Sequence, residues 1–338
     1  MRALPFVDSA LLSDLLSWPT AIAALGRALG PAYAEGGFTE RTSVPLDNGE
    51  LLLMPAAGSE TVGVKIIGVA PRNPEQGLPR IQGLYTLFDA HTLAPLAVLD
   101  GTALTTVRTA GQSAFVVREL APEQARRLVV FGAGPQAEAH VEAVRAVRAI
   151  DTVRIVGRRQ ERVAALCERL GRSGIDVRPG EPGDVASADI VVCATTSATP
   201  VFDGADLADH AFVVAVGSHT PDARELDGHV FSRASLVLVE HRQTALREAG
   251  DIVRAVEDGA LDPGRLLDFG DLAGLRAGGG SPSTRASEWA GRTWPSPRRY
   301  GSPCRQATTG SRRPVTQRPF GGGTGARRRR RRGQGRTR

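Results

Sequence analysis

The sequence predicts an α/β protein with a Rossmann-type, doubly wound parallel sheet, an α+β domain before it and a disordered tail after it. Short apolar runs alternate with helical patterns between residues 128 and 240, and this alternation is typical of a parallel sheet. The first apolar run leads directly into a glycine-rich turn. After about residue 280 the periodicity stops, and Gly, Ser, Pro and Arg dominate. We therefore predict domains at residues 1–122 and 123–275 and a tail at 276–338.

The first domain mixes helical and strand-like patterns. Apolar residues at helical spacing predict a helix over residues 8–35, and a long helix with alanine and valine on one face is predicted over 102–118. Short apolar runs bounded by turn residues predict strands at 51–54, 62–69, 81–88 and 96–99. This mixture is typical of an α+β domain.

The second domain carries the alternating pattern. We expect helices from the glycine-rich turn to about residue 148 and over 161–170, and strands at 128–131, 153–156, 189–194, 211–216 and 236–240. Strands joined by crossover helices run parallel. Their carboxyl ends should therefore share one edge of the sheet, which is where such sheets bind ligands.

The charge of the chain is unevenly distributed. The formal net charge is +6, from 42 basic and 36 acidic side chains. Residues 281–338 hold 16 arginines and one acid, Glu288, which leaves 26 basic and 35 acidic side chains in residues 1–280. The body is therefore acidic, and we expect no nucleic-acid partner. A nucleic-acid or membrane-surface role for the arginine run is the alternative for the tail.

The cysteines, the histidines and the apolar segments limit which compartment and which cofactors we expect. Cys167, Cys193 and Cys304 fit neither a CxxC site nor a disulfide framework, which favours a reducing cytoplasm. The start of the chain shows no apolar segment of a signal peptide, and no window approaches the ~18 apolar residues of a membrane span. The six histidines are scattered, so we expect no metal.

The motif Gly132-x-Gly134-x-x-Ala137 predicts a dinucleotide site, because it follows a strand and opens a helix. The first glycine makes the tight turn, and the second lets the backbone approach a pyrophosphate at the helix N-terminus. NAD-binding folds usually carry an acid after the second strand, which binds the ribose 2′-hydroxyl. Here Arg158 and Arg159 follow instead, so we predict NADP(H), with NAD(H) possible. Solvated arginines at a helix start are the alternative interpretation.

Polar residues follow two further strands of the predicted sheet. Thr195 and Thr196 come after strand 189–194, and Val216 and Gly217 end the next strand and begin its loop. Because these strand ends share the ligand-binding edge, we expect Thr195, Val216 and Gly217 to contact the cofactor.

The chain resembles the ornithine cyclodeaminase/mu-crystallin family from near its start to about residue 275. The matching stretches, in order, are residues 41–56, 64–66, 77–83, 99–105, 108–110, 132–137, 217–227 and 248–251. The resemblance implies a substrate-binding and dimerisation domain followed by the Rossmann domain. It further implies cofactor contacts at Arg80, Arg108, Thr109 and Gln136.

The family holds the carboxylate of an amino or imino acid with two arginines and one lysine. The resemblance places these roles at Arg41, Lys65 and Arg108. A planar carboxylate suits a bidentate arginine, whereas lysine supplies a compact charge and a transferable proton. The only lysine of the chain thus matches the family's active-site lysine. Surface ion pairs are the alternative interpretation of Arg41 and Arg108.

Cyclodeaminases resembling this chain convert ornithine to proline with an aspartate in the loop after the fifth Rossmann strand. The aligned residue here is His219, which lacks a permanent negative charge. Mu-crystallin-like members also lack this acid and look like ketimine reductases. We therefore predict NAD(P)H-dependent reduction of a cyclic imino acid, such as Δ1-pyrroline-2-carboxylate or Δ1-piperideine-2-carboxylate, with Lys65 acting on the imine nitrogen. His219 either relays a proton, since histidine ordinarily titrates near neutrality, or is a spectator.

Three other functions stay open at this point: ornithine cyclodeaminase, a related amino-acid dehydrogenase, and a cofactor-binding protein with little turnover.

In the tail, residues 282–297 can be back-translated so that a frame shifted by two bases reads Val-His-Lys-Ser-Val-Gly-Met-Gly-Gly-Glu-Asp-Leu-Ala-Val-Ala. Family members usually carry a Lys-Ser-Val-Gly-Met segment there. A frameshift upstream of about residue 282 is therefore our hypothesis, and the gene's codons test it.

Overall fold

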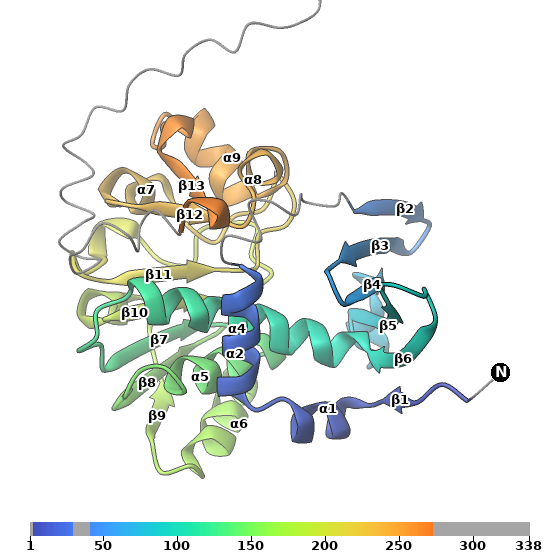
Figure 1. Ribbon diagram of the computed structural model, residues 1–338. Coiled ribbons are helices and arrows are strands. Elements are labelled where there is room, and N and C mark those ends of the chain that lie inside the picture. Colours follow the sequence, from blue (N-terminus) through green and yellow to red (C-terminus); the bar gives the residue numbers. More distant parts are fainter. Residues whose placement is uncertain (1–2, 30–40, 273–338) are drawn as a thin grey trace, which may run out of the picture. The chain divides into compact units, whose positions relative to one another are not determined.

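The computed structural model describes residues 3–29 and 41–272, which lie within one compact unit, residues 1–292. The predicted tail, with its shifted-frame hypothesis, and the end of the predicted helix 8–35 lie outside the described residues. Figure 1 shows two main sheets, the first built from the N-terminal residues and the second from the middle of the chain. Within the described part, no helix is long and apolar enough to cross a membrane.

The N-terminal sheet has six strands in the order β1-β6-β5-β4-β3-β2. Its strands are β1 (Phe6–Val7), β2 (Thr42–Leu46), β3 (Gly49–Ala57), β4 (Thr61–Val69), β5 (Ile81–Asp89) and β6 (Pro95–Asp100). Strands β2 to β6 pair antiparallel, and β1 joins β6 in parallel. The four predicted strands are confirmed. We missed β1, which has two residues, and β2, which contains Pro45 and buries none of its side chains.

The helix predicted over residues 8–35 is wrong as one element. It is two helices, α1 (Ser9–Leu15) and α2 (Trp18–Ala28). The break lies at Ser17, whose hydroxyl accepts the backbone N–H of Thr20 as an N-cap. Pro19 is tolerated in this first turn but would remove a hydrogen bond from the interior of a continuous helix.

The long helix α4 (Gly101–Leu120) connects the two sheets along the chain, and its predicted position is confirmed. The carboxylate of Asp100 caps it by accepting the N–H groups of Thr102 and Ala103 at 2.8 and 3.0 Å. Helix α4 packs against α2 and against α5 (Pro135–Arg145), which begins at the glycine-rich turn. Residues on α4 therefore stand close to the dinucleotide motif.

The two faces of the N-terminal sheet differ in burial. In β4, Gly63, Lys65 and Ile67 are buried, whereas Ile66 between them is 37% exposed. Ile66 lies opposite Leu84 of β5, which is 47% exposed. Because side chains of a strand alternate between faces, one face of this sheet is buried and the other is apolar and exposed.

The second sheet is parallel, with the order β11-β10-β7-β8-β9. Its strands are β7 (Arg127–Phe131), β8 (Thr152–Val156), β9 (Asp176–Pro179), β10 (Ile190–Cys193) and β11 (Phe212–Ala215). Val129 and Val130 belong to two different buried clusters, one on each face of the sheet. Apolar runs buried on both faces are typical of parallel strands, which is why the sequence revealed four of these five.

The strand predicted at 236–240 does not join this sheet. It is β12 (Val237–Val239), which pairs in parallel with β13 (Leu266–Asp268) as a separate two-stranded sheet. The remaining helices are α6 (Gln160–Gly171), α7 (Gly228–Arg233), α8 (Arg242–Glu248) and α9 (Gly250–Glu257), with 3₁₀ turns η1 (Asn73–Gln76), η2 (Pro182–Ser187), η3 (Gly204–Asp206), η4 (Pro263–Arg265) and η5 (Phe269–Asp271).

His140 of α5 is buried in the contact between α4 and α5. Its Nδ1 donates to the carbonyl oxygen of Gln136 at 2.7 Å, and its Nε2 lies 3.0 Å from the hydroxyl of Ser113 on α4. Burial is the main reason that the pKa of His140 is lowered to about 4, and the bond to Gln136 opposes it.

We expect this histidine to make folding stability depend on pH. An unfolded histidine titrates near pH 6.5, so between about pH 6.5 and 4 the unfolded chain binds a proton that the folded chain does not. Because of this group, the free energy of unfolding of the wild type should fall by on the order of 2 kcal/mol between pH 7 and 5. When the free energy of unfolding is measured with urea, His140→Gln should lack this part of the decrease. Identical pH dependence in both proteins would contradict the prediction.

Candidate functional site

The glycine-rich turn adopts a conformation that requires glycine at its first position. Gly132 follows β7 with a φ of +118°, and a Cβ there would come within 2.5 Å of the carbonyl oxygen of Ala194 after β10. L-residues with side chains avoid this backbone region. Gly132 thus allows the loops after β7 and β10 to lie against each other.

The space next to the Cα of Gly134 is open. A Cβ on Gly134 would meet no atom within 4 Å. Gly134 is the N-cap residue of α5, and no capping side chain forms a hydrogen bond there. Oε1 of Gln136, on the first turn, is buried and has no hydrogen-bond partner. Ala137 is fully buried and packs into the core. A free helix N-terminus beside a bare backbone fits the pyrophosphate of a dinucleotide.

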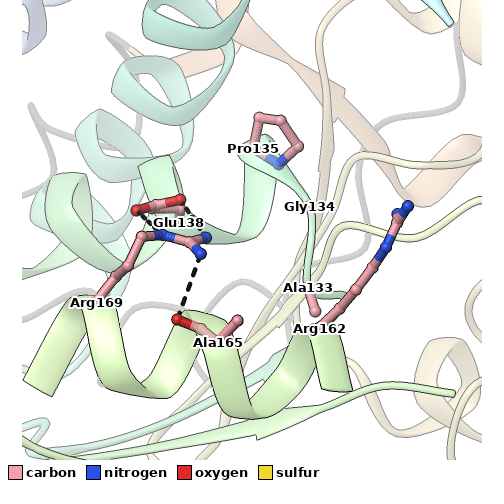
Figure 2. A pocket seen from close by; sticks show the side chains of 7 residues that line it. All are labelled: Ala133, Gly134, Pro135, Glu138, Arg162, Ala165 and Arg169. Carbon is pink, nitrogen blue, oxygen red and sulfur yellow. Dashed lines mark hydrogen bonds and ion pairs between the residues drawn. The ribbon is translucent and has the colours of Figure 1, made fainter. Parts of the chain in front are cut away.

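A pocket of about 230 Å³ adjoins this turn. Figure 2 shows its lining residues: Ala133, Gly134, Pro135, Glu138, Arg162, Ala165 and Arg169. Arg169 is held by Glu138 through bonds of 3.1 and 2.9 Å, whereas Arg162 extends beside the turn (Figure 2). Within the described residues, the side chain of Arg162 has no ion pair. Sequence reasoning missed Arg162, although it follows Arg158 and Arg159 by one helical turn.

The predicted 2′-phosphate residues lie at the start of α6. Arg158 and Arg159 follow β8 and are exposed, and Arg159 is the N-cap residue of α6. Neither of these two side chains forms an ion pair with another described residue. Their guanidinium groups are therefore available to an anion at the end of β8.

Thr195, Val216 and Gly217 lie at the carboxyl ends of β10 and β11, as the sequence predicted. The carboxylate of Glu225 joins the two loops. Its Oε1 accepts the backbone N–H and the hydroxyl of Thr195 at 2.6 and 2.7 Å, and its Oε2 accepts the N–H of Gly217 at 2.7 Å. His219 is exposed on the second loop, with Nδ1 2.9 Å from the carbonyl oxygen of Gly217.

Lys65 projects from β4 toward the start of α4. Its ammonium group lies 3.5 Å from the hydroxyl of Thr105, and the residue is 9% exposed. Burial lowers the pKa of Lys65 to about 8, the positive charge of Arg108 adds to this effect, and the negative charge of Glu240 opposes it. A lysine with this pKa readily gives up its proton near neutral pH.

Arg108 shares Glu240 with a second side chain of α4. Oε1 of Glu240, directly after β12, accepts from Nη1 of Arg108 at 3.2 Å and from the amide of Gln112 at 2.7 Å. Nε of Arg108 is buried and has no partner. Arg108 therefore keeps a donor in the buried part of the site.

Arg41, before β2, forms an ion pair with Glu248 at the end of α8. Arg80 is half-buried before β5, and no hydrogen bond joins its side chain to another described residue. The hydroxyl of Thr109 donates to the carbonyl oxygen of Thr105 within α4. The structure thus brings Lys65 and Arg108 together, whereas no contact links Arg41 or Arg80 to them.

The acids of the site were missed by sequence reasoning. Glu240 ends the last predicted strand, and a polar residue at a strand's carboxyl end is a usable signal. Gln112 follows Arg108 by four residues and so shares its helix face. Glu225 lies in the family-matching stretch 217–227, but its role could not be predicted, because its hydrogen-bond partners Thr195 and Gly217 are 30 and 8 residues away along the chain.

One group of potential metal ligands occurs within the described residues: Asp203, Asp227 and His229. The carboxylate of Asp203 accepts the N–H of Ala205, and that of Asp227 accepts the N–H groups of Gly204 and Val230. These bonds cap η3 and α7, so we assign the group to capping.

Comparison with known proteins gives one family. The model of the ornithine cyclodeaminase/mu-crystallin family matches residues 24–268. A Δ1-pyrroline-2-carboxylate reductase from Bacillus cereus is 35% identical over 275 residues, which cover 78% of this chain and 84% of the reductase.

Solved structures with the same fold include the following two. The Δ1-pyrroline-2-carboxylate reductase of Thermococcus litoralis, in complex with NADH and L-proline, superposes with a TM-score of 0.75 at 28% identity and covers 80% of this chain and 87% of its own. An archaeal alanine dehydrogenase dimer with bound NAD also gives 0.75, at 26% identity, and covers 80% of this chain and 85% of its own.

We expect Gly134→Ala to separate dinucleotide binding from folding. The new Cβ meets no protein atom, so the melting temperature should stay unchanged. It would stand where a pyrophosphate must approach the backbone, so NADH affinity, measured by fluorescence titration, should fall about tenfold or more. Gly171→Ala is the matched control, because a Cβ at Gly171 in α6 also meets no atom. Wild-type affinity in Gly134→Ala would refute the assignment.

Proposed function

Because this chain belongs to the ornithine cyclodeaminase/mu-crystallin family, we propose that it reduces a cyclic imino acid, such as Δ1-pyrroline-2-carboxylate or Δ1-piperideine-2-carboxylate, with NAD(P)H. The observation that carries the proposal is the buried Lys65 with its lowered pKa beside Arg108. The product would be the cyclic L-amino acid. L-proline is such a product, and the Thermococcus reductase binds it together with NADH.

Arg108 would bind the carboxylate of the imino acid. Glu240 engages only Nη1, and the Arg108 side chain is 38% exposed, so its guanidinium group can also face a second carboxylate. Arg41 would supply the second positive charge, in exchange with or alongside Glu248. The carboxylate of Glu240 would balance the charge of Arg108, and that of Glu248 the charge of Arg41, before substrate arrives.

Lys65 would deliver the proton. A bound nicotinamide supplies the hydride that the imine carbon takes up. The electron pair of the C=N π bond moves to nitrogen, which takes the proton from the Lys65 ammonium group. Because its pKa is lowered to about 8, this ammonium is a stronger acid than an exposed lysine. The deprotonated amine left on Lys65 regains its proton from solvent. His219 would assist this relay from the loop after β11.

The test is a screen of both cyclic imines with NADPH and with NADH, in which the loss of nicotinamide absorbance measures turnover. We expect turnover of at least one imine, with formation of the cyclic amino acid. Incubation with ornithine and catalytic NAD⁺ tests the second family activity. Proline and ammonia formed in that reaction, without imine reductase activity, would replace our proposal with cyclodeaminase. Tight nucleotide binding without turnover would replace it with a binding role.

Lys65→Arg keeps the positive charge but removes the readily transferred proton. We expect kcat/KM for the imine to fall by a factor of about 100 or more. In the wild type, kcat/KM should decrease above about pH 8, because the donor must be protonated and its pKa is about 8. A pH profile without this decrease, or an active Lys65→Arg variant, would exclude Lys65 as the proton donor.

We propose further that the chain prefers NADP(H), since Arg158 and Arg159 stand where NAD-binding folds carry an acid. The double variant Arg158→Ser/Arg159→Ser should weaken NADPH binding about tenfold or more and leave NADH binding unchanged. Arg172→Ser, in the exposed pair with Glu168 just after α6, is the control. Equal losses for both nucleotides would contradict a 2′-phosphate site.

We propose that two copies pair through the exposed apolar face of the N-terminal sheet, which includes Ile66 and Leu84. Ile66→Asp/Leu84→Asp should convert a dimer into a monomer in sedimentation velocity. Leu93→Asp is the control, because Leu93 is 65% exposed but lies in the β5–β6 turn. A wild type that sediments as a monomer would overturn the proposal.

A further inference from the structure

Glu225 is a fully buried carboxylate in the described residues, and the catalytic proposal does not use it. It is 0% exposed and lies in the segment between β11 and α7. All three of its side-chain hydrogen bonds go to the loops that follow β10 and β11. It therefore bridges the two strand ends at which ligands of a parallel sheet bind.

The two loops are in close contact and are also joined by hydrogen bonds through Glu225. A Cβ on Gly217 would come within 2.1 Å of the carbonyl oxygen of Thr195 and within 2.7 Å of the Glu225 carboxylate. The absence of a side chain at Gly217 thus lets the loop after β11 lie directly on that carboxylate. A shift of Glu225 would move Thr195 and Gly217 together.

A second buried acid fixes the backbone of Glu225. Oδ1 of Asp251, in the first turn of α9, accepts the N–H groups of Glu225 and Leu226 at 2.7 and 2.9 Å. The N–H of Asp251 in turn donates to the hydroxyl of Ser218, which donates to the carbonyl oxygen of Ala223. The loop that carries His219 is therefore closed at both of its ends.

We propose that Glu225 is a positioning residue that sets the spacing of the loops after β10 and β11. It thereby sets the position at which the nicotinamide half of the cofactor binds. This proposal rests on the proposed dinucleotide site. Both carboxylate oxygens accept, and their partners are two N–H groups and a hydroxyl. An ionised carboxylate offers acceptors on both sides, whereas an amide would turn an NH₂ group toward one of the loops.

The ionised form of Glu225 can accept from all three of these donors. Burial is the main influence on Glu225 and raises its pKa, and the neighbouring charge of Asp251 acts in the same direction. The hydrogen bonds from Thr195 and Gly217 oppose this rise, because they stabilise the carboxylate. The two loops thus stabilise the group that holds them.

The experiment compares two carboxylate-to-amide changes in the full chain. Glu225→Gln turns an NH₂ group toward a donor, so NADH affinity in fluorescence titration should fall about tenfold or more. Asp189→Asn is the control, because Asp189 is a buried carboxylate that accepts backbone N–H groups directly before β10, at the opposite edge of the sheet, so its NADH affinity should stay within about twofold of the wild type. Both variants change a buried carboxylate into an amide, so melting temperatures measured without nucleotide record the structural effect separately.

Wild-type NADH affinity in Glu225→Gln would overturn the proposal, as would an equal loss in Asp189→Asn. If Glu225→Gln does not fold, Glu225→Asp replaces it. That side chain keeps the charge but is one methylene too short to reach both loops, and unchanged affinity would again overturn the proposal. Because nucleotide binding is measured directly, the result does not depend on whether any imine is reduced. A chain that binds NADH but reduces no imine would overturn the proposed function and leave the Glu225 test intact.

Discussion

The parallel register of the second sheet is the constraint on which the candidate site depends. Strands β7, β10 and β11 pair in register, so the loops that follow them emerge at one edge. Their backbones can then come into contact, as Gly132 does with Ala194 and Gly217 with Thr195. Close contact leaves backbone N–H groups that need acceptors, and Glu225 supplies them for two of the loops.

Electrostatic balance is the second requirement of the site. Lys65 comes from the N-terminal sheet and Arg108 from α4, and the charge of Arg108 adds to burial in lowering the pKa of Lys65. Glu240 follows β12 and pairs with Arg108, and its negative charge stabilises both cations. The ion pair of Arg41 with Glu248 repeats this arrangement, with an acid from the C-terminal part of the chain again facing a cation from the N-terminal part.

Much of the fold could be predicted because local patterns repeat over several residues. Buried runs such as 128–131 showed the parallel strands, and the turn at Gly132 and Gly134 located the dinucleotide motif. The predictions failed where an element is short or its pattern ambiguous. Strand β12 has three residues and pairs outside the main sheet, and the break at Ser17 interrupts an apolar period that continues across it.

The sequence by itself determined the family, the glycine-rich turn and the lysine of the candidate site, since each depends on residue types at fixed positions along the chain. Tertiary structure alone decided which acids meet the cations and how the strand-end loops are joined. Arg108 and Glu240 are 132 positions apart, and no local pattern encodes such a contact. The lowered pKa of Lys65 also arises there, because burial and neighbouring charges exist only after the chain has folded.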